Sequence, residues 1–503
     1  MSAVPKLRLL CILATALFAP AAFAAQAAKP DPYAPIRADI EKEIAAGGLT
    51  GVSVALVKDG KIVWEQGFGW ADRDARKPAT AHTAFSIAST TKPFTTTALM
   101  RLAADGKLDL DRPANDYLGA EKIVDANGPS REATLRRLAT HSSGLPTFFA
   151  MYPENGDAKQ PSIPELIRDY GHLVAPVGER YEYSNLGMGI LAEIVARQSK
   201  QEFGEYLRDH VLNPLGMKDS FFDTDLSRRA EMATRYADDG KPLPFYTTAT
   251  PGSGEMYASA HDLARFAMFH LGGEGLDATA KILDQARLVE LHRPETTVAP
   301  GGYFYGMGWQ VLRQPERAEV LYHGGGQSGV KAEFVLVPSA GAAVVVLSNR
   351  RGPKGFIDGV RDRLLKIAVP DWTALPVTPS APLKPLQPAK DYRGQWRGTM
   401  LAQGKRVPVV LAIADDGTGT LAVNGGAARP IADLGTVDGV ISGESQGDVD
   451  SPDTRRERLD QLSLGLKLRG DRIDGEIVAW RKTSESMAMY PFWTALRRVP
   501  AQK

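Results

Sequence analysis

The chain has 503 residues, of which 43% are hydrophobic and 24% are charged. This composition is typical of a globular protein with room for two or three domains, and it argues against disorder and coiled coil. The 60 basic and 59 acidic residues give a formal net charge of +1, so no strong field favours nucleic acid or an anionic membrane as a partner.

The N-terminus has the pattern of a secretory signal peptide over residues 1–24. Lys6 and Arg8 precede an apolar run over residues 9–18, and small residues follow up to Ala24. We expect cleavage after Ala24 and a periplasmic or extracellular product that is not attached to a membrane. A membrane anchor is the alternative, but the run is shorter than the roughly 20 residues that a spanning helix needs. The single cysteine lies in this segment, so the mature chain should contain no thiol.

The next segments predict one α/β domain over residues 30–368. Residues 52–57 and 62–67 alternate as two strands joined by Asp59-Gly60, a dipeptide suited to a tight hairpin. A helix is expected from about Thr91 to Ala104. Further helices are expected at residues 164–170, 187–198 and 259–271, and further strands at residues 333–337 and 343–348. Helices between an early and a late group of strands favour a sheet completed by the end of the domain.

A different pattern begins at residue 369. Over residues 369–390, prolines recur every third residue from 376 to 388, which predicts a stiff polyproline II spacer, or alternatively an irregular loop on the protein surface. Residues 391–503 show period-two alternation interrupted by turn dipeptides, and we expect an antiparallel β-barrel or sandwich there. This segment contains no histidine or cysteine, which argues against a separate metal site or nucleophile.

Ser89-Thr90-Thr91-Lys92 is the first candidate catalytic motif. It places a hydroxyl and an amine on one face at a helix entrance, where the amine can take up the serine proton. The helix N-terminus adds partial positive charge beside a developing anion. Ser328-Gly329-Val330-Lys331 matches the same pattern, but it follows glycines and leads into a strand, so only the first copy has the right context.

Two further stretches are candidate parts of the site. Tyr183-Ser184-Asn185 stands in a polar loop before a helix, and a tyrosine near a lysine ammonium can have a lowered pKa and act as a general base. His323-Gly324-Gly325-Gly326 allows the backbone to pass close to a ligand, beside an imidazole able to bind a carboxylate or polarise an oxygen. Taken alone, residues 183–185 would be interpreted as a tyrosine that caps a turn, and residues 323–326 as a glycine-rich turn with a surface histidine.

Together these motifs resemble serine β-lactamases and penicillin-binding DD-peptidases, most of all the class C-like branch with D-aminopeptidases and esterases. The likeness spans roughly residues 35 to 365 and keeps the family's order. Its other parts are the stretches at residues 85–94, 105–111, 138–146, 305–309 and 347–349. It implies an antiparallel sheet flanked by helices plus an all-helical region. Residues 391–503 look like the lipocalin-like domain attached to some peptidases of this family.

The resemblance also implies residue roles. Ser89 would be acylated, Lys92 and Tyr183 would transfer protons, and Asn185 would hydrogen-bond substrate and Lys92. The main-chain amides of Ser89 and Gly326 would form the oxyanion hole. No cofactor and no metal are implied, and the expected partner is a small-molecule or short-peptide substrate, with a homo-oligomer left open.

One departure from the family pattern bears on the substrate. His323-Gly324-Gly325 stands where many β-lactamases and DD-peptidases have Lys-Thr-Gly. Histidine is only partly charged near neutral pH, so we expect a weaker hold on a substrate carboxylate. This argues against efficient β-lactam hydrolysis and favours a peptidase or esterase, since D-aminopeptidase-like members of the family carry His-x-Gly here. Of these, we expect a peptidase for small or D-amino-acid-containing peptides. An esterase or β-lactamase, a non-hydrolytic penicillin- or peptidoglycan-binding protein and an acyl transferase are the alternatives.

Other chemistry finds less support in the sequence. His141 and His261 are interpreted as structural, because no catalytic role needs them once Lys92 and Tyr183 are assigned. No zinc-hydrolase spacing such as His-Glu-x-x-His occurs. Gly443-Glu444-Ser445-Gln446-Gly447 matches a nucleophile elbow, but no histidine follows it, so we interpret the match as chance.

Overall fold

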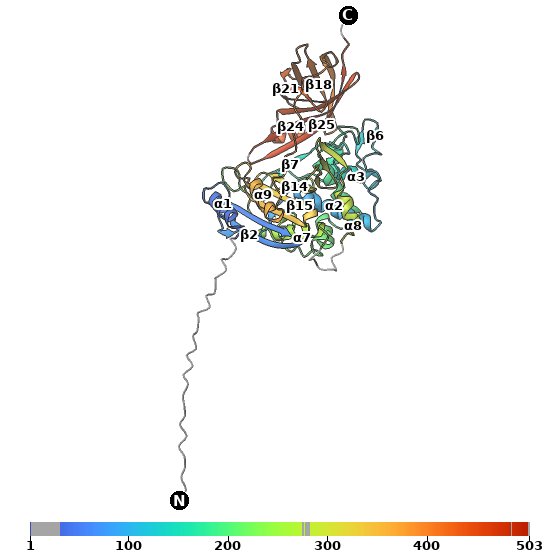
Figure 1. Cartoon of the computed structure of the whole chain (residues 1–503). Coiled ribbons are helices and arrows are strands. Elements are labelled where there is room, and N and C mark those ends of the chain that lie inside the picture. Colours follow the sequence, from blue (N-terminus) through green and yellow to red (C-terminus); the bar gives the residue numbers. More distant parts are fainter. Residues whose placement is uncertain (2–30, 274–275, 277–281, 484, 501–503) are drawn as a thin grey trace.

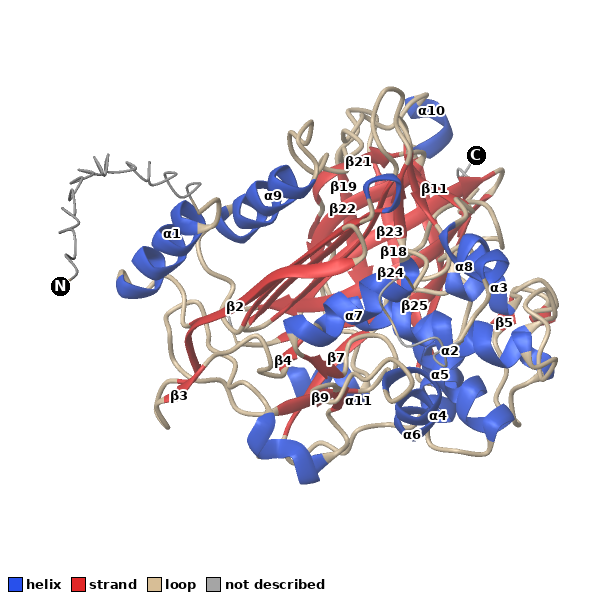
Figure 2. Ribbon diagram, turned by 60° about the horizontal axis from the view of Figure 1, so that its bottom comes forward, coloured by secondary structure: helices blue, strands red, loops and turns tan. Residues whose placement is uncertain are grey.

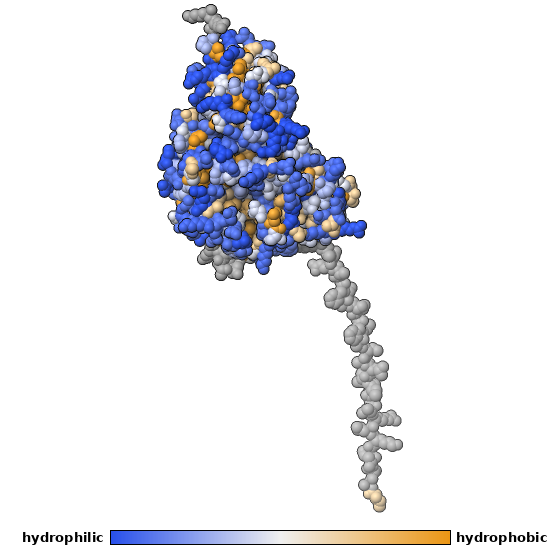
Figure 3. Space-filling model, turned by 180° about the vertical axis from the view of Figure 1, so that it is seen from behind, coloured by the Kyte–Doolittle hydropathy of each residue, from blue (hydrophilic) through white to orange (hydrophobic). Residues whose placement is uncertain are grey.

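The computed structural model describes residue 1 and residues 31–273, 276, 282–483 and 485–500 (Figure 1). Apart from Met1, the predicted signal peptide lies outside these residues. Within these ranges, no helix is both long and apolar enough to cross a membrane. Polar and charged residues cover most of the face shown in Figure 3.

A nine-stranded antiparallel sheet forms the centre of the first part of the chain, in the order β11-β12-β13-β14-β15-β16-β1-β2-β3. Its strands are β1 (Gly51–Lys58), β2 (Lys61–Asp72), β3 (Lys77–Pro78), β11 (Thr296–Ala299), β12 (Tyr303–Tyr305), β13 (Gln310–Leu312), β14 (Val320–Gln327), β15 (Val330–Val337) and β16 (Ala342–Ser348). The early hairpin pairs with the late strands through β1 and β16, which confirms the predicted single sheet. Asp59 and Gly60 both have positive φ in the predicted turn.

Helices cover both faces of this sheet (Figure 2). They are α1 (Ala34–Ala45) and α9 (Phe356–Ala368) on one face, and α7 (Ala260–His270) with α2 (Lys92–Ala104) behind it on the other. Strand β1 alternates accordingly, because Val54 and Leu56 pack in the cluster with α1 and α9, whereas Ala55 and Val57 pack in the cluster with α2 and α7. With both faces covered, nearly every side chain of β1 is buried.

The remaining helices surround α2. They are α3 (Leu135–Ala139), α4 (Ile163–Tyr170), α5 (Asn185–Ser199), α6 (Phe203–Leu207) and α8 (Gln285–His292). Helices α5, α6 and α8 contact α2 directly, and α3 and α4 contact α5, so this is the predicted all-helical region. The helices expected at residues 164–170, 187–198 and 259–271 are confirmed to within two residues at each end. This part also contains the short strands β4 (Phe85–Ser86), β5 (Val124–Asp125), β6 (Gly128–Pro129), β8 (Phe221–Phe222) and β10 (Met256–Ala258).

The C-terminal strands form a second antiparallel sheet, as the sequence predicts. They are β17 (Gly394–Ala402), β18 (Lys405–Ile413), β19 (Gly419–Val423), β20 (Arg429–Pro430), β21 (Ala432–Val437), β22 (Val440–Gln446), β23 (Gln461–Arg469), β24 (Arg472–Lys482) and β25 (Met487–Arg498). The order runs β20-β19-β18-β17-β25-β24-β23-β22-β21. Strands β19 and β20 also lie against β22, so the sheet curls into a nearly closed barrel. Short helices α10 (Ala389–Tyr392) and α11 (Pro452–Glu457) flank it.

The proline-rich segment follows the protein surface. Between Val369 and Pro388 it forms no helix or strand apart from a bridge between Lys384 and Thr436. Trp372 and Leu375 are buried in the hydrophobic cluster that α1 and α9 form with the sheet. The Tyr303 hydroxyl also donates to the Val377 carbonyl at 3.0 Å. This arrangement corresponds to the surface-loop alternative rather than to a free spacer.

Strand β25 extends from the barrel into the first part of the chain (Figure 1). Its residues Ala488 and Met489 pair with β7 (Phe149–Pro153), which in turn pairs with β9 (Tyr246–Thr248). Glu179 adds polar contacts at this junction, because it accepts from Lys467 at 2.8 Å and from Arg469 at 2.9 Å. The barrel is therefore joined to the segment that directly follows Phe148, a neighbour of the site described next.

Candidate active site

Ser89 lies in a 3₁₀ turn, Ala88–Thr91, that leads directly into α2. Ala88 has φ of 45°, a left-handed conformation that is uncommon outside glycine. The turn is fixed by two side-chain hydrogen bonds, from Thr91 Oγ1 to the Ala88 carbonyl at 2.7 Å and from Thr90 Oγ1 to the His323 carbonyl at 3.2 Å. Both threonines are buried, whereas Ser89 stays partly exposed. The serine hydroxyl is therefore held on a rigid turn with access from outside.

Lys92 is fully buried and its amine points at three oxygen atoms. Its Nζ lies 3.1 Å from Ser89 Oγ, 2.9 Å from Asn185 Oδ1 and 2.8 Å from the Ser253 carbonyl. Burial lowers the pKa of Lys92 from 10.5 to about 7, against a smaller opposing effect of the Glu255 carboxylate. An amine with this pKa is partly neutral near neutral pH, so it can accept the Ser89 proton.

Tyr183 completes the contacts of the serine. Its hydroxyl donates to Ser89 Oγ at 2.9 Å, and Lys92 Nζ lies 4.7 Å from the centre of its ring. Burial raises the pKa of Tyr183 above its ordinary value. The lowered pKa expected from the sequence is therefore not found in the unliganded site, because desolvation of the phenolate outweighs the opposing hydrogen bond with Ser89. Tyr183 is a proton donor here, and Lys92 is the better candidate base.

Asn185 orients the lysine. It is the first residue of α5, whose N-cap Ser184 accepts from the Gly187 amide at 2.9 Å. Asn185 Oδ1 accepts from Lys92, and Asn185 Nδ2 donates to the Phe148 carbonyl at 3.3 Å. Both ends of the side chain are engaged, so its orientation is fixed beside the amine.

His323 lies at the same site, but as a neutral ring. Its Nδ1 donates to the Gly324 carbonyl at 2.9 Å, which leaves Nε2 to accept from the Tyr305 hydroxyl at 3.0 Å. Burial, together with the nearby Lys92 amine, lowers the pKa of His323 to about 3. The expectation of a partly charged imidazole is therefore wrong for this state, because the ring is removed from water. Tyr305 was not assigned a role from the sequence.

The glycines after His323 let β14 pass close to the serine turn. A Cβ at Gly325 would lie 2.0 Å from the Ile87 carbonyl oxygen, two residues before Ser89. At Gly326 a Cβ would meet no atom within 4 Å, and this residue is exposed. Gly325 thus allows the close approach of backbone to backbone, and Gly326 borders open space where a substrate can lie against the strand.

Gly325→Ala is expected to lower kcat/KM by about 10²-fold, because the strand must shift away from the Ser89 turn and small misplacements of reacting groups cost this much. The matched control is Gly359→Ala in α9, where a Cβ meets no atom within 4 Å. Turnover of a chromogenic ester by both variants checks this. Equal activity of the two variants would show that the close approach of β14 is not needed.

His141 supports Tyr183 from behind. Its ring centre lies 4.5 Å from that of Tyr183 and 4.6 Å from that of Tyr305, and its Nδ1 accepts from the Ser184 amide at 3.1 Å. Burial, aided by the Lys92 amine, holds the pKa of His141 well below its ordinary value, so this ring is neutral as well. Its contacts are those of a residue that positions the tyrosine loop.

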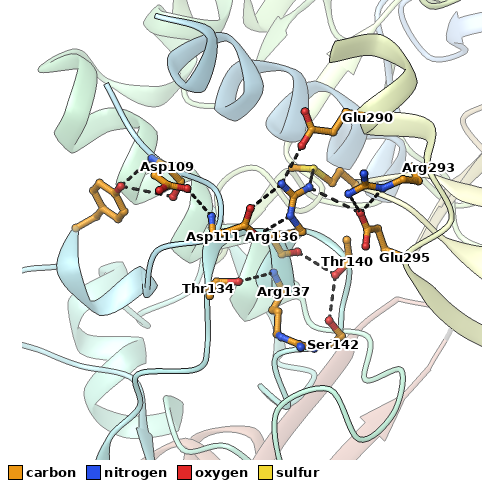
Figure 4. A network of polar contacts seen from close by, with 12 residues as sticks. Asp109, Asp111, Thr134, Arg136, Arg137, Thr140, Ser142, Glu290, Arg293 and Glu295 are labelled. Carbon is orange, nitrogen blue, oxygen red and sulfur yellow. Dashed lines mark hydrogen bonds and ion pairs between the residues drawn. The ribbon is translucent and has the colours of Figure 1, made fainter. Parts of the chain in front are cut away.

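The segment that carries His141 is anchored by a network around Arg136 (Figure 4). The guanidinium binds Asp111 through two nitrogens at 2.7 and 3.0 Å, Glu290 at 2.8 Å and Glu295 at 3.7 Å. The Arg136 carbonyl accepts from Thr140 Oγ1 at 2.9 Å, directly before His141. The network joins α3 to α8 and thereby fixes the segment whose His141 packs against the Tyr183 ring.

Arg136→Met is expected to lower the free energy of unfolding by roughly 2 kcal/mol, because a side chain only 17% exposed would leave three carboxylates without their shared partner. Arg293→Met is the control, since that side chain is 55% exposed and should change stability by no more than about 0.5 kcal/mol. Urea denaturation of both variants measures the difference. Equal effects would show that the network does not stabilise the fold.

Glu255 is a neighbour of the site that sequence reasoning missed. It is buried and accepts from the Gly254 amide at 2.8 Å and from the Thr248 hydroxyl. Burial raises its pKa to about 7, with the Lys92 amine acting in the opposite direction. A buried carboxylate that titrates with the lysine adjusts how readily Lys92 holds a proton. Only its place after Gly252-Ser253-Gly254, in a glycine-rich loop, could have drawn attention to it.

The two competing serine motifs lie outside this arrangement. Ser328 is in the β14–β15 turn, and Lys331 Nζ binds Glu333 at 2.6 Å and Asp358 at 3.0 Å instead of a serine. Ser445 lies within β22 and donates to the Pro430 carbonyl at 3.0 Å, so no strand-to-helix elbow is present there. The structural context thus separates Ser89 from both.

An antiparallel sheet between helices, with Ser-x-x-Lys at the start of α2 and a tyrosine on the same hydroxyl, defines a β-lactamase-like protein. The family model described as Beta-lactamase matches residues 36–368, and the chain belongs to this family, whose members are generally serine hydrolases. It is 28% identical over 316 residues to "Protein flp" of Staphylococcus aureus strain MW2, which covers 62% of this chain and 61% of that protein. The chain thus matches less than two thirds of the length of the first curated relatives.

Two solved structures are similar over most of the chain. The octameric penicillin-binding protein homologue from Pyrococcus abyssi aligns with a TM-score of 0.58 at 21% identity, over 92% of this chain and 99% of that one. SurE with D-Leu aligns with a TM-score of 0.62 at 19% identity, over 91% and 99%. At these identities the likeness shows the fold alone, which includes the C-terminal barrel.

Proposed function

We propose that this chain is an exported serine hydrolase that cleaves an amide or ester through an acyl-enzyme, with small peptides containing D-amino acids as its preferred substrates. One observation carries the proposal. Ser89 Oγ lies 3.1 Å from Lys92 Nζ and 2.9 Å from the Tyr183 hydroxyl, and the pKa of that lysine is about 7. A serine with a neutral amine beside it is an activated nucleophile at neutral pH.

The proposed reaction has two halves. Ser89 Oγ attacks the substrate carbonyl carbon while its proton passes to Lys92, and the amides of Ser89 and Gly326 hold the oxyanion. The bond to the leaving amine or alcohol then breaks, and Tyr183 delivers the proton that the leaving group needs, with Lys92 replenishing it. A water molecule then attacks the ester formed on Ser89 and gives a proton to the same pair. The pair returns that proton to Ser89 Oγ as the ester bond breaks, which releases the carboxylic acid and regenerates the serine.

The neutral state of His323 supports the choice of substrate class. A ring with a pKa of about 3 supplies no positive charge for the carboxylate of a β-lactam or a DD-peptide. This favours substrates that need no cation at that position, such as D-aminoacyl amides and short esters. The structural neighbour SurE was solved with D-Leu, which agrees with a site for a D-amino acid.

Parallel kinetics on D- and L-alanine p-nitroanilide, a p-nitrophenyl ester and a penicillin test this choice. The D-anilide is expected to be hydrolysed faster than the L-anilide, and the penicillin slowest. A preference for the L-anilide, or efficient penicillin hydrolysis, contradicts the substrate class but leaves the acyl-enzyme intact.

The alternatives differ in the fate of the acyl group. A binding protein would keep a penicillin adduct in intact-mass measurements, whereas a hydrolase regains its free mass. A transferase would give a new ester or amide when an alcohol or amine is added.

Export and self-association complete the proposal. The charged and apolar pattern of residues 1–24 supports export, and cleavage after Ala24 is checked by sequencing the N-terminus of the purified protein. The octamer named for the Pyrococcus abyssi homologue supports a homo-oligomer, which light scattering during size exclusion measures. Retention of Met1 would contradict export with cleavage, and a monomeric mass would contradict self-association.

A further inference from the structure

Two histidines and a glutamate from separate parts of the chain meet beside α7. Glu65 lies in β2, His82 in the loop before β4, and His261 in the first turn of α7. Each can offer one ligand atom, and the three atoms lie within 4.8 Å of one another. The side chains are 27%, 54% and 26% exposed, so an ion can reach them from solvent. Among the described residues, the side-chain hydrogen bonds, ion pairs and ring contacts of these three join them to one another and to Asp219.

The distances suit a first-row transition metal. His261 Nδ1 lies 2.9 Å from Glu65 Oε2, and His82 Nε2 lies 4.0 Å from Glu65 Oε1. Zinc, with bonds of about 2.0 to 2.1 Å, holds neighbouring ligand atoms about 3.3 Å apart in a tetrahedral shell. Since the three ligand atoms lie within 4.8 Å of one another, decreases of at most about 1.5 Å in their separations bring them to coordination distance.

A second carboxylate orients His82 in the manner typical of a metal ligand. His82 Nδ1 lies 2.7 Å from Asp219 Oδ2. Because a carboxylate accepts, this contact places the proton on Nδ1 and leaves the Nε2 lone pair toward Glu65. Metal-bound histidines commonly donate their other N–H to a carboxylate in this way.

The cluster is held in place by its scaffold. The Asp219 amide donates at 2.8 Å to Asp262 Oδ2, and Asp262 is a buried residue of α7 next to His261. The His261 amide in turn donates to the Ala81 carbonyl at 3.1 Å, next to His82. The backbone of His261 is thus bonded to the residue before His82, and His82 is linked through Asp219 to the side chain after His261, so little order has to be created when an ion binds.

We propose that Glu65, His82 and His261 form a zinc site, with Asp219 orienting His82 and water completing a four-coordinate shell. On binding, the ring proton of His261 resides on Nε2, through exchange with solvent, so that the Nδ1 lone pair ligates the ion in place of the hydrogen bond to Glu65. Two imidazoles and one carboxylate favour zinc over calcium or magnesium, which prefer oxygen ligands alone. The ion joins β2, α7 and the loop that leads to the Ser89 turn, so its role is to stabilise this part of the fold.

Zinc titration of the purified chain, without a polyhistidine tag and after chelation and dialysis, tests the site. We expect one zinc ion per chain, an absorption band in the visible range with cobalt, and a higher melting temperature with zinc. Asp219→Asn should weaken zinc binding by roughly 10- to 100-fold, and His82→Ala by more. The control is His210→Ala, which removes an exposed histidine from another part of the chain and should change none of these readouts.

Glu65→Gln keeps the shape of the side chain and serves where His82→Ala fails to fold. Unchanged zinc affinity in a folded Glu65→Gln or His82→Ala variant would overturn the assignment. So would the absence of saturable zinc binding to the wild-type chain.

Discussion

Ser89→Ala is expected to lower kcat/KM by about 10⁴-fold or more on every substrate that the wild-type protein hydrolyses. Alanine has no atom that can attack a carbonyl carbon, and the two groups around the hydroxyl, Lys92 and Tyr183, then have nothing to activate. The variant should keep its stability, because Ser89 is partly exposed and alanine fits the same turn. Initial rates on a chromogenic ester, at protein concentrations raised to detect the residual activity, measure the loss.

Ser328→Ala is the matched control. This serine belongs to the second Ser-x-x-Lys sequence, whose Lys331 is bound to Glu333 and Asp358. Its removal should leave kcat/KM within a few-fold of the wild type. Full activity in Ser89→Ala, or a selective loss in Ser328→Ala, would contradict the assignment of the nucleophile.

Lys92→Met carries the second largest expected effect, a loss of about 10²- to 10⁴-fold in kcat/KM. The Tyr183 hydroxyl also contacts Ser89 Oγ, but burial raises the pKa of that phenol, so it cannot replace the amine as the base. Methionine has a similar length and suits a fully buried position. The substitution also removes the hydrogen bonds to Asn185 Oδ1 and to the Ser253 carbonyl, so the melting temperature is measured beside the rate to show that the variant is folded. A rate within about tenfold of the wild type would assign the base to another group.

The pH dependence follows from the same lysine. The amine must be neutral to accept a proton, and burial lowers its pKa to about 7. The value of kcat/KM should therefore rise as pH increases through about 7 and level off above it, and Lys92→Met should abolish that rise. Because the pKa of Glu255 is also about 7, the rise belongs to the interacting pair, and Glu255→Gln is expected to move its midpoint to lower pH. A flat profile in the wild type would contradict a lysine base.

Much of the fold was predictable because its signals are local. The hairpin of β1 and β2 is encoded by alternation and by Asp59-Gly60, which takes up the positive φ that such a turn requires. The entrance to α2 follows from Pro93 in its first turn. Ser89 and Lys92 could be paired from their spacing together with their place at a helix entrance, whereas spacing alone would also have paired Ser328 with Lys331.

The parts that could not be predicted depend on residues distant in the sequence. Protonation states follow from burial, which explains why Tyr183 has a raised pKa although a lysine stands beside it. Glu255 carries no motif, and its effect on Lys92 exists only through folding. The pairing of β7 with β25 joins segments separated by most of the chain, and β7 is too short to stand out as a strand.

The central claim, that Ser89 is an activated nucleophile, is tested most directly by intact-mass analysis after treatment with a fluorophosphonate probe. We predict one adduct on the wild-type chain and on Ser328→Ala, and none on Ser89→Ala. An adduct that persists in Ser89→Ala, or one that is never formed on the wild type, would contradict the claim.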